Sequence, residues 1–271
     1  MLLAVGLGAF GWDRAVDALS RETSVAYAGD EKASPAEHGS ASKGVDAKPA
    51  TKAKPKKGEP EILPVPGHGR AYVFSPAGSG LKPVLMYLHG RGGYPAEDCK
   101  KWAKVAREFG WAVCPEGQED RGNGARGWNN DPSTGRVVVN AALAALREKY
   151  ARRVQLRGNV IVGFSEGAFV AMQAGLNDAK TWNRWLILGA SDAYIPPNKE
   201  AIEEKREDIK RVFLFTGQTD EVAPATERAA KLLRSASVSV KTKLEPGLGH
   251  EVPAEKMKTN YRRPLLWLLK D

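Results

Sequence analysis

The sequence predicts an α/β domain whose central sheet is mostly parallel, with helices on both faces. Two features of residues 61–271 lead to this prediction. Short continuous apolar runs indicate strands that are buried on both faces. Longer amphipathic stretches alternate with them, as in right-handed βαβ crossovers. The expected strands are Ala71–Phe74, Val84–Leu88, Trp111–Cys114, Val160–Phe164, Trp185–Leu188, Val212–Thr216 and Val238–Leu244, and the expected helices are Glu97–Phe109, Val137–Tyr150, Glu166–Gly175, Pro224–Ser235 and Ala254–Leu269.

The predicted domain has no internal repeat and no insertion long enough for a large cap domain. The largest candidate insertion is Ala190–Lys210, which contains a charged, helix-like piece at Lys199–Lys210. We expect that piece to be a solvated connecting helix.

The N-terminal 60 residues differ in composition from the rest of the chain. Residues 2–11 form an apolar run, too short to span a bilayer but similar to the central part of a secretory signal. We therefore interpret 1–28 as a signal or anchor; an N-terminus of a cytosolic enzyme is the alternative. Residues 29–60 are rich in Ala, Lys and Pro with few large apolar side chains, which predicts a disordered tether before the domain at 61–271. Together these features favour a periplasmic or envelope-associated protein over a cytoplasmic one.

The chain has 271 residues and a net charge of +9, of which residues 61–271 contribute +8, from 32 Lys and Arg against 24 Asp and Glu. The positive charges are scattered and form no basic stripe interleaved with aromatic side chains, which argues against a nucleic-acid partner. A solvated basic surface is the simplest interpretation. Attraction to anionic substrates, or weak association with an anionic envelope surface, is the alternative.

The segment Val160–Ala168 carries the clearest chemical signal. An apolar strand runs directly into Gly163-Phe164-Ser165-Glu166-Gly167, and a helical pattern follows at once. This is the context of a nucleophile elbow, in which a serine lies on a sharp strand-to-helix turn. The start of the following helix favours negative charge beside the serine. Ser165 is therefore the candidate nucleophile.

A serine nucleophile needs a base and a carboxylate that orients the base. Only one of the four histidines, His250, follows Ser165, and it lies in a glycine-containing loop after the last expected strand. Asp220 follows the strand Val212–Thr216 and is the candidate acid, with Asp192, after the preceding strand, as the competitor. The chain order Ser, Asp, His is the one that a nucleophile elbow predicts.

The loop His89-Gly90-Arg91-Gly92-Gly93 follows another expected strand. Stabilisation of an oxyanion needs two backbone N–H donors. We expect one from Glu166, which follows the nucleophile, and one from Arg91, with Gly92 as the alternative. His89 is expected to be structural and to hold its loop by hydrogen bonds.

Four segments in this order make residues 61–271 resemble the α/β-hydrolase family, and within it the capless carboxylesterase, phospholipase and dienelactone-hydrolase-like branch. They are residues 89–93 (HGRGG), 163–167 (GFSEG), 217–224 (GQTDEVAP) and 247–250 (GLGH). The resemblance implies an α/β-hydrolase fold in which these positions supply nucleophile, acid, base and oxyanion donors. It does not extend to residues 1–60.

Four further residues complete the expected site and its surroundings. Trp128 and Tyr194 are candidates for the substrate pocket, with ordinary packing as the alternative for Trp128. Cys99 and Cys114 are expected near the same edge of the sheet, where they form either a disulfide, favoured by export, or buried thiols.

The function predicted from these residues is hydrolysis of small carboxylic esters through an acyl-serine intermediate. No metal or organic cofactor is implied, and the sequence does not indicate the oligomeric state. A serine peptidase with the same triad is one alternative. A non-catalytic envelope-binding module on a hydrolase scaffold is another, of a different class.

Overall fold

The computed structural model describes residues 56–270. The predicted signal or anchor at 1–28, and the predicted tether up to residue 55, lie outside this range. The last part of the predicted tether, Lys56–Pro60, is placed against the domain. These residues form a turn in which the Glu59 N–H donates to the Lys56 carbonyl oxygen at 3.0 Å. The Glu59 carboxylate forms an ion pair with Lys100 of the domain at 2.8 Å.

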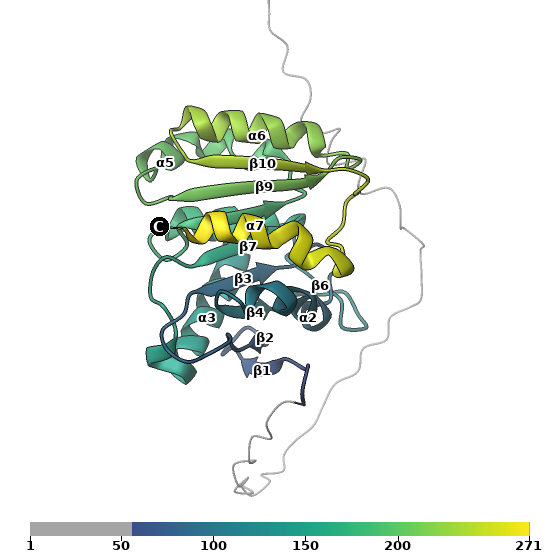
Figure 1. The fold of residues 1–271 in the computed structure, drawn as a ribbon, viewed down its shortest axis with the longest axis vertical. Helices are drawn as coiled ribbons and strands as arrows, with labels where there is room; N and C mark the ends of the chain where they lie inside the picture. Colours follow the sequence, from purple (N-terminus) through teal and green to yellow (C-terminus); the bar gives the residue numbers. More distant parts are fainter. Residues whose placement is uncertain (1–55, 271) are drawn as a thin grey trace, which may run out of the picture. The chain divides into compact units, whose positions relative to one another are not determined.

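An eight-stranded sheet forms the centre of the domain (Figure 1). Its strand order is β1-β2-β4-β3-β7-β8-β9-β10. The pairs β1–β2 and β2–β4 are antiparallel, and the other neighbours are parallel. The strands are β1 (Glu61–Pro64), β2 (Arg70–Phe74), β3 (Val84–Leu88), β4 (Trp111–Pro115), β7 (Val160–Phe164), β8 (Arg184–Leu188), β9 (Arg211–Gly217) and β10 (Val240–Glu245).

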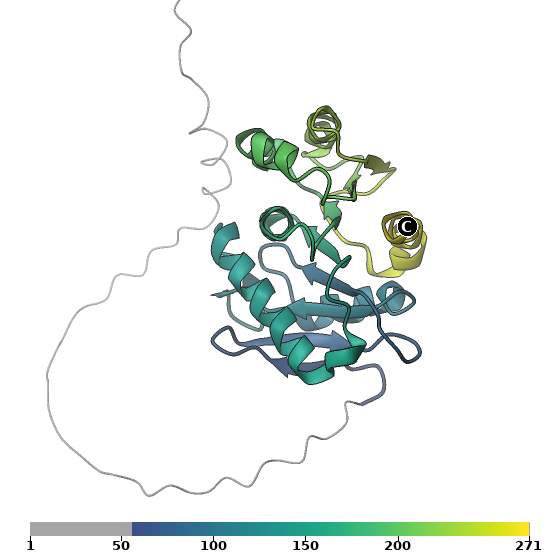
Figure 2. The ribbon, with the colours of Figure 1, turned by 90° about the vertical axis from the view of Figure 1, so that its left-hand side faces the viewer.

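Helices cover both faces of the sheet (Figure 2). On one face, α2 (Pro95–Ala106) and α7 (Met257–Leu269) bury Trp102 and Tyr261 against the sheet. On the other face lie α3 (Pro132–Tyr150), α4 (Glu166–Asn177) and α6 (Ala223–Ser235), with the short α5 (Lys199–Glu204) beside them. The mostly parallel sheet between two helical layers confirms the predicted fold class, and no cap domain is evident in residues 56–270.

Several elements differ from the sequence prediction. The strand β1 was not predicted, because it is a four-residue edge strand with a mixed burial pattern. The hairpin of β5 (Glu119–Asp120) and β6 (Arg126–Gly127) was not predicted either, because each strand has two residues and no apolar run. The helix α3 begins at Pro132 rather than Val137, since the Asp131 side chain caps it by accepting the Ser133 and Thr134 N–H groups.

One helix and one strand are shorter in the structure than the sequence predicted, because local turns end or delay them. The charged helix predicted to reach Lys210 ends at Glu204, and turns follow in which the Asp208 N–H donates to the Lys205 carbonyl oxygen. The strand predicted from Val238 begins at Val240. Ser237 has a φ of 61°, and the Val238 N–H donates to Leu233, so these residues end α6 instead of extending the strand.

A disulfide joins Cys99 in α2 to Cys114 in β4, with 5.7 Å between the Cα atoms. Both residues are almost completely buried. A disulfide that closes a loop of about 15 residues raises the free energy of unfolding by roughly 3 kcal/mol, because it restricts the unfolded chain. It fixes α2 to the sheet next to the strand that precedes the His89–Gly93 loop.

No helix within residues 56–270 is long and apolar enough to cross a membrane.

Candidate active site

Ser165 occupies the sharp turn between β7 and α4. Its backbone has φ 53° and ψ −121°, a conformation that a non-glycine residue adopts only when the surrounding structure enforces it. The glycines on either side permit the turn. A Cβ on Gly163 would lie 2.4 Å from the Gly167 carbonyl oxygen, and a Cβ on Gly167 would lie 2.4 Å from the carbonyl oxygens of both Leu88 and His89. The two glycines therefore let β7, α4 and the end of β3 approach each other.

A chain of two hydrogen bonds connects Ser165 to His250 and His250 to Asp220. The distance from Ser165 Oγ to His250 Nε2 is 2.9 Å, and the distance from His250 Nδ1 to Asp220 Oδ2 is 2.8 Å. The three residues follow β7, β9 and β10, whose carboxyl ends meet at one edge of the sheet. The structure thus brings together the three residues that the sequence singled out as nucleophile, acid and base.

Asp220 is buried, whereas His250 is close to the surface. The Asp220 side chain is 2% exposed and the His250 side chain 45% exposed. The second carboxylate oxygen of Asp220 accepts the Val222 N–H at 3.0 Å. When Asp220 is ionised it accepts a hydrogen bond from the protonated Nδ1 of His250, and this tautomer leaves Nε2 as an acceptor for the Ser165 hydroxyl.

The competing acid, Asp192, is engaged elsewhere. Its carboxylate forms a two-pronged ion pair with Arg228 of α6, at 2.8 and 3.0 Å. The hydrogen bond to Arg228 lowers the pKa of Asp192 below its ordinary value. Of the two candidate carboxylates, Asp220 is the one in contact with His250.

The loop after β3 lies against the nucleophile. A turn from Gly90 to Gly93 is closed by the Gly93 N–H to the Gly90 carbonyl oxygen, 3.0 Å, and Gly92 has a φ of 71°. A Cβ on Gly90 would lie 3.2 Å from Ser165 Cβ, so the loop passes directly beside the serine. Within residues 56–270, the backbone N–H groups of Arg91, Gly92 and Glu166 have no hydrogen-bond partner, and these are the predicted oxyanion donors.

His89 is buried at the base of this loop and has a structural role, as the sequence predicted. Its Nδ1 donates to the Gly90 carbonyl oxygen at 2.8 Å, and its Nε2 accepts the Gly117 N–H at 3.1 Å. Burial lowers the pKa of His89. Because Nε2 is an acceptor, the ring is neutral, and both of its nitrogens are used to hold the loop.

Comparison with solved structures identifies the architecture. Esterase PE8 matches with a TM-score of 0.57 at 21% identity, over 73% of this chain and 97% of that one. An S-formylglutathione hydrolase from Agrobacterium tumefaciens matches with a TM-score of 0.55 at 17% identity, over 74% and 88% of the two chains. The chain has the α/β-hydrolase fold.

A third structural neighbour is longer than this chain. It is an uncharacterized protein from Bacillus cereus ATCC 10987, matched with a TM-score of 0.61 at 18% identity, and the match covers 70% of this chain and 60% of that one. No protein-family model matches the chain, and no curated protein matches it in sequence. Its similarity to these solved structures is therefore one of fold.

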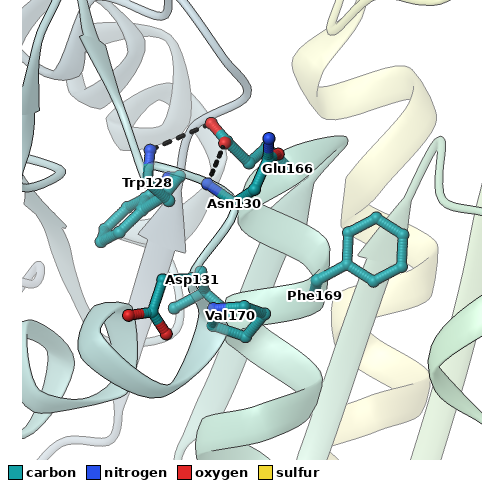
Figure 3. A pocket seen from close by; sticks show the side chains of 7 residues that line it. Trp128, Asn130, Asp131, Glu166, Phe169 and Val170 are labelled. Atoms are coloured by element: carbon teal, nitrogen blue, oxygen red, sulfur yellow. Dashed lines mark hydrogen bonds between the residues drawn. The ribbon is translucent and has the colours of Figure 1, made fainter. Parts of the chain in front are cut away.

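Within this α/β-hydrolase fold, the side chain of Glu166 has a role that the sequence analysis missed. The carboxylate accepts the Trp128 N–H at 3.0 Å and the Asn130 N–H at 2.9 Å (Figure 3). Arg91 of the His89–Gly93 loop lies 3.5 Å from the same carboxylate and also bonds the Asn130 side chain. Glu166 thus holds the segment from Trp128 to Asn130 and the Arg91 loop beside Ser165. An acidic residue directly after the nucleophile was the available signal.

Of the two predicted pocket residues, Trp128 lines a cavity near the site and Tyr194 does not. The cavity has a volume of about 240 Å³. The Trp128 indole is fully buried, donates to the His89 carbonyl oxygen at 2.8 Å and stacks on the His89 ring. The Tyr194 hydroxyl instead bonds Gln173 of α4 at 2.6 Å, and burial raises the pKa of Tyr194. The residues around the cavity are Trp128, Asn130, Asp131, Pro132, Glu166, Phe169 and Val170.

Proposed function

We propose that the chain is a serine hydrolase that cleaves carboxylic esters through an acyl-serine intermediate. The observation that carries this proposal is the hydrogen-bonded series Ser165, His250 and Asp220 at a strained nucleophile turn. A serine without a catalytic role would not require a strained backbone conformation or a hydrogen bond to a histidine that is itself held by a buried carboxylate. The resemblance in fold to esterase PE8 supports ester hydrolysis.

In the first half of the proposed reaction, Ser165 Oγ attacks the ester carbonyl carbon as its proton passes to His250 Nε2. The carbonyl oxygen becomes an oxyanion, which the N–H groups of Glu166 and of Arg91 or Gly92 stabilise. Asp220 stabilises the imidazolium that forms. The ester C–O bond then breaks, and the leaving oxygen takes the proton from Nε2, which gives an alcohol and an acyl-serine.

In the second half, a water molecule attacks the acyl carbon and gives a proton to His250 Nε2. The tetrahedral intermediate collapses with cleavage of the bond to Ser165 Oγ, which regains the proton from His250. The products are a carboxylic acid and free enzyme. Every group in this scheme belongs to the chain, the ester or water.

The purified protein is expected to hydrolyse p-nitrophenyl butyrate with a pre-steady-state burst of p-nitrophenol, because an activated phenol leaves faster than the acyl-serine is hydrolysed. A matched p-nitroanilide should react far more slowly. Stopped-flow absorbance measures both. Faster cleavage of the anilide would favour the peptidase alternative, and a folded protein that cleaves neither would favour a non-catalytic binding module.

We also propose that the protein is exported to the periplasm or cell envelope. The buried disulfide between Cys99 and Cys114 supports this, because disulfides persist in oxidising compartments. N-terminal sequencing of the native protein tests it: a mature N-terminus near residue 28, at the end of the predicted signal or anchor, is expected. An intact Met1 on a protein with both thiols reduced would contradict it.

A further inference from the structure

The cavity beside the nucleophile has a defined position relative to the triad. One of its walls is the first part of α4, through Glu166, Phe169 and Val170, and Ser165 is the residue that precedes this helix. The opposite wall is the segment that enters α3, through Trp128 and Pro132. The cavity therefore starts at the residue whose N–H is a proposed oxyanion donor.

The triad histidine approaches Ser165 from a different part of the sheet. His250 and Asp220 come from the loops after β10 and β9, and the His250 ring packs on Phe164. In the strand order, β9 and β10 lie on one side of β7, and β3 with its oxyanion loop lies on the other. The leaving oxygen of an ester must face His250, because His250 protonates it. The acyl part then points away from His250, toward the cavity.

The cavity offers an apolar surface in spite of its two carboxylates. Both oxygens of Glu166 accept backbone N–H groups from the opposite wall. The Asp131 carboxylate caps α3 through the N–H groups of Ser133 and Thr134. These acceptors are already engaged, and Trp128 and Val170 are almost completely buried. What remains for a ligand is chiefly contact with the half-buried Phe169.

Behind the lining residues Trp128 and Val170, the helices α3 and α4 pack closely, and this limits how far the cavity extends. A Cβ on Gly135 of α3 would lie 2.7 Å from Val170 Cγ1 and 3.1 Å from Trp128 Cε3, so α3 and α4 leave no room to extend the space there. The volume of about 240 Å³ exceeds that of an apolar cavity able to hold benzene, about 150 Å³. A benzoyl group or a short acyl chain matches this size.

We propose that this cavity is the acyl-binding site, and that the substrates are esters of short-chain or aromatic carboxylic acids, with Phe169 setting the length limit. The proposal rests on the ester hydrolysis proposed above. Phe169 is half-buried on the wall of α4, so its size changes the space without removing a group from the triad.

The test is the acyl-length profile of kcat/KM for p-nitrophenyl acetate, butyrate, benzoate, octanoate and decanoate. The wild-type protein should prefer butyrate and benzoate to decanoate. Phe169→Ala should raise the octanoate-to-butyrate ratio on the order of 10-fold, and Phe169→Trp should lower the benzoate-to-acetate ratio by a similar factor, since a pocket discriminates at roughly this level per methylene. Thermal unfolding verifies that each variant is folded.

Two controls make the result specific. Phe109→Ala removes another half-buried phenyl group, one that packs on the opposite face of the sheet, and should leave the profile unchanged. A series of acetate esters with alcohols of increasing length should show the same profile in wild type and Phe169→Ala.

Three outcomes would overturn the acyl assignment while leaving Ser165-dependent hydrolysis intact. They are a wild-type preference for decanoate, an unchanged profile in both Phe169 variants, and a change that follows alcohol length. A folded wild-type protein that hydrolyses none of these esters would overturn the proposed function as well.

Discussion

Ser165→Ala is expected to lower kcat for ester hydrolysis by about 10⁵- to 10⁶-fold, because serine, histidine and aspartate act as a unit and the loss of the nucleophile removes covalent catalysis altogether. The substitution deletes a single oxygen and one hydrogen bond, of 2.9 Å, to His250. Backbone geometry at position 165 and the packing of Gly163 and Gly167 do not depend on that oxygen.

The measurement is kcat on p-nitrophenyl butyrate with purified wild type and variant, together with the midpoint of thermal unfolding. The unfolding midpoint should change little, since only a partly exposed hydroxyl is lost. Activity of the variant within a factor of ten of the wild type, in a folded sample, would mean that another group attacks the ester.

Asp220→Asn is expected to lower kcat by about 10⁴-fold while KM changes little. The amide group introduced by this substitution would present an N–H to His250 Nδ1, and the ring would then carry its proton on Nε2. That tautomer cannot accept the Ser165 proton. Asp220 is buried, with a side chain 2% exposed, so the group at position 220 and not solvent sets the hydrogen bond at His250 Nδ1.

Asp192→Asn is the matched control for this prediction. Asp192 was the other carboxylate that the sequence offered, and it pairs with the exposed Arg228. The loss of such an exposed pair should change stability little, and kcat should stay within about twofold of wild type. An Asp192→Asn variant that loses more activity than Asp220→Asn would show that the acid has been assigned to the wrong residue.

The main strands, and the three residues that the structure joins by hydrogen bonds, Ser165, His250 and Asp220, could be singled out because most of them have a strong local signal. Val84–Leu88 and Val160–Phe164 are central strands buried almost throughout, so they appear in the sequence as unbroken apolar runs with the correct ends. Ser165 stands at the junction of such a run with a helix. His250 was found by elimination among four histidines.

The parts that were missed depend on contacts between distant segments. The edge strand β1 and the β5–β6 hairpin have no continuous apolar run, so their pairing is visible only in the folded chain. The role of the Glu166 side chain arises from Trp128 and Asn130, 38 and 36 residues away. The sequence indicated the backbone role of Glu166 but contained no sign of these partners.

Tyr194 shows how a local pattern can suggest the wrong neighbour. It follows β8 at the carboxyl edge of the sheet, which made it a pocket candidate. The turn at residues 192–194 directs its hydroxyl to Gln173 on α4, so it packs on the helix. Phe169 and Val170, three and four residues after Glu166, share its helix face and line the cavity instead.

Covalent labelling with a fluorophosphonate is the most direct test of Ser165 as an activated nucleophile. The intact mass of the wild-type protein should increase by one adduct, and peptide mapping should place that adduct on Ser165. The folded Ser165→Ala variant should remain unlabelled. Absence of an adduct on folded wild type, or an adduct that persists in the variant, would contradict the assignment of Ser165 as the nucleophile.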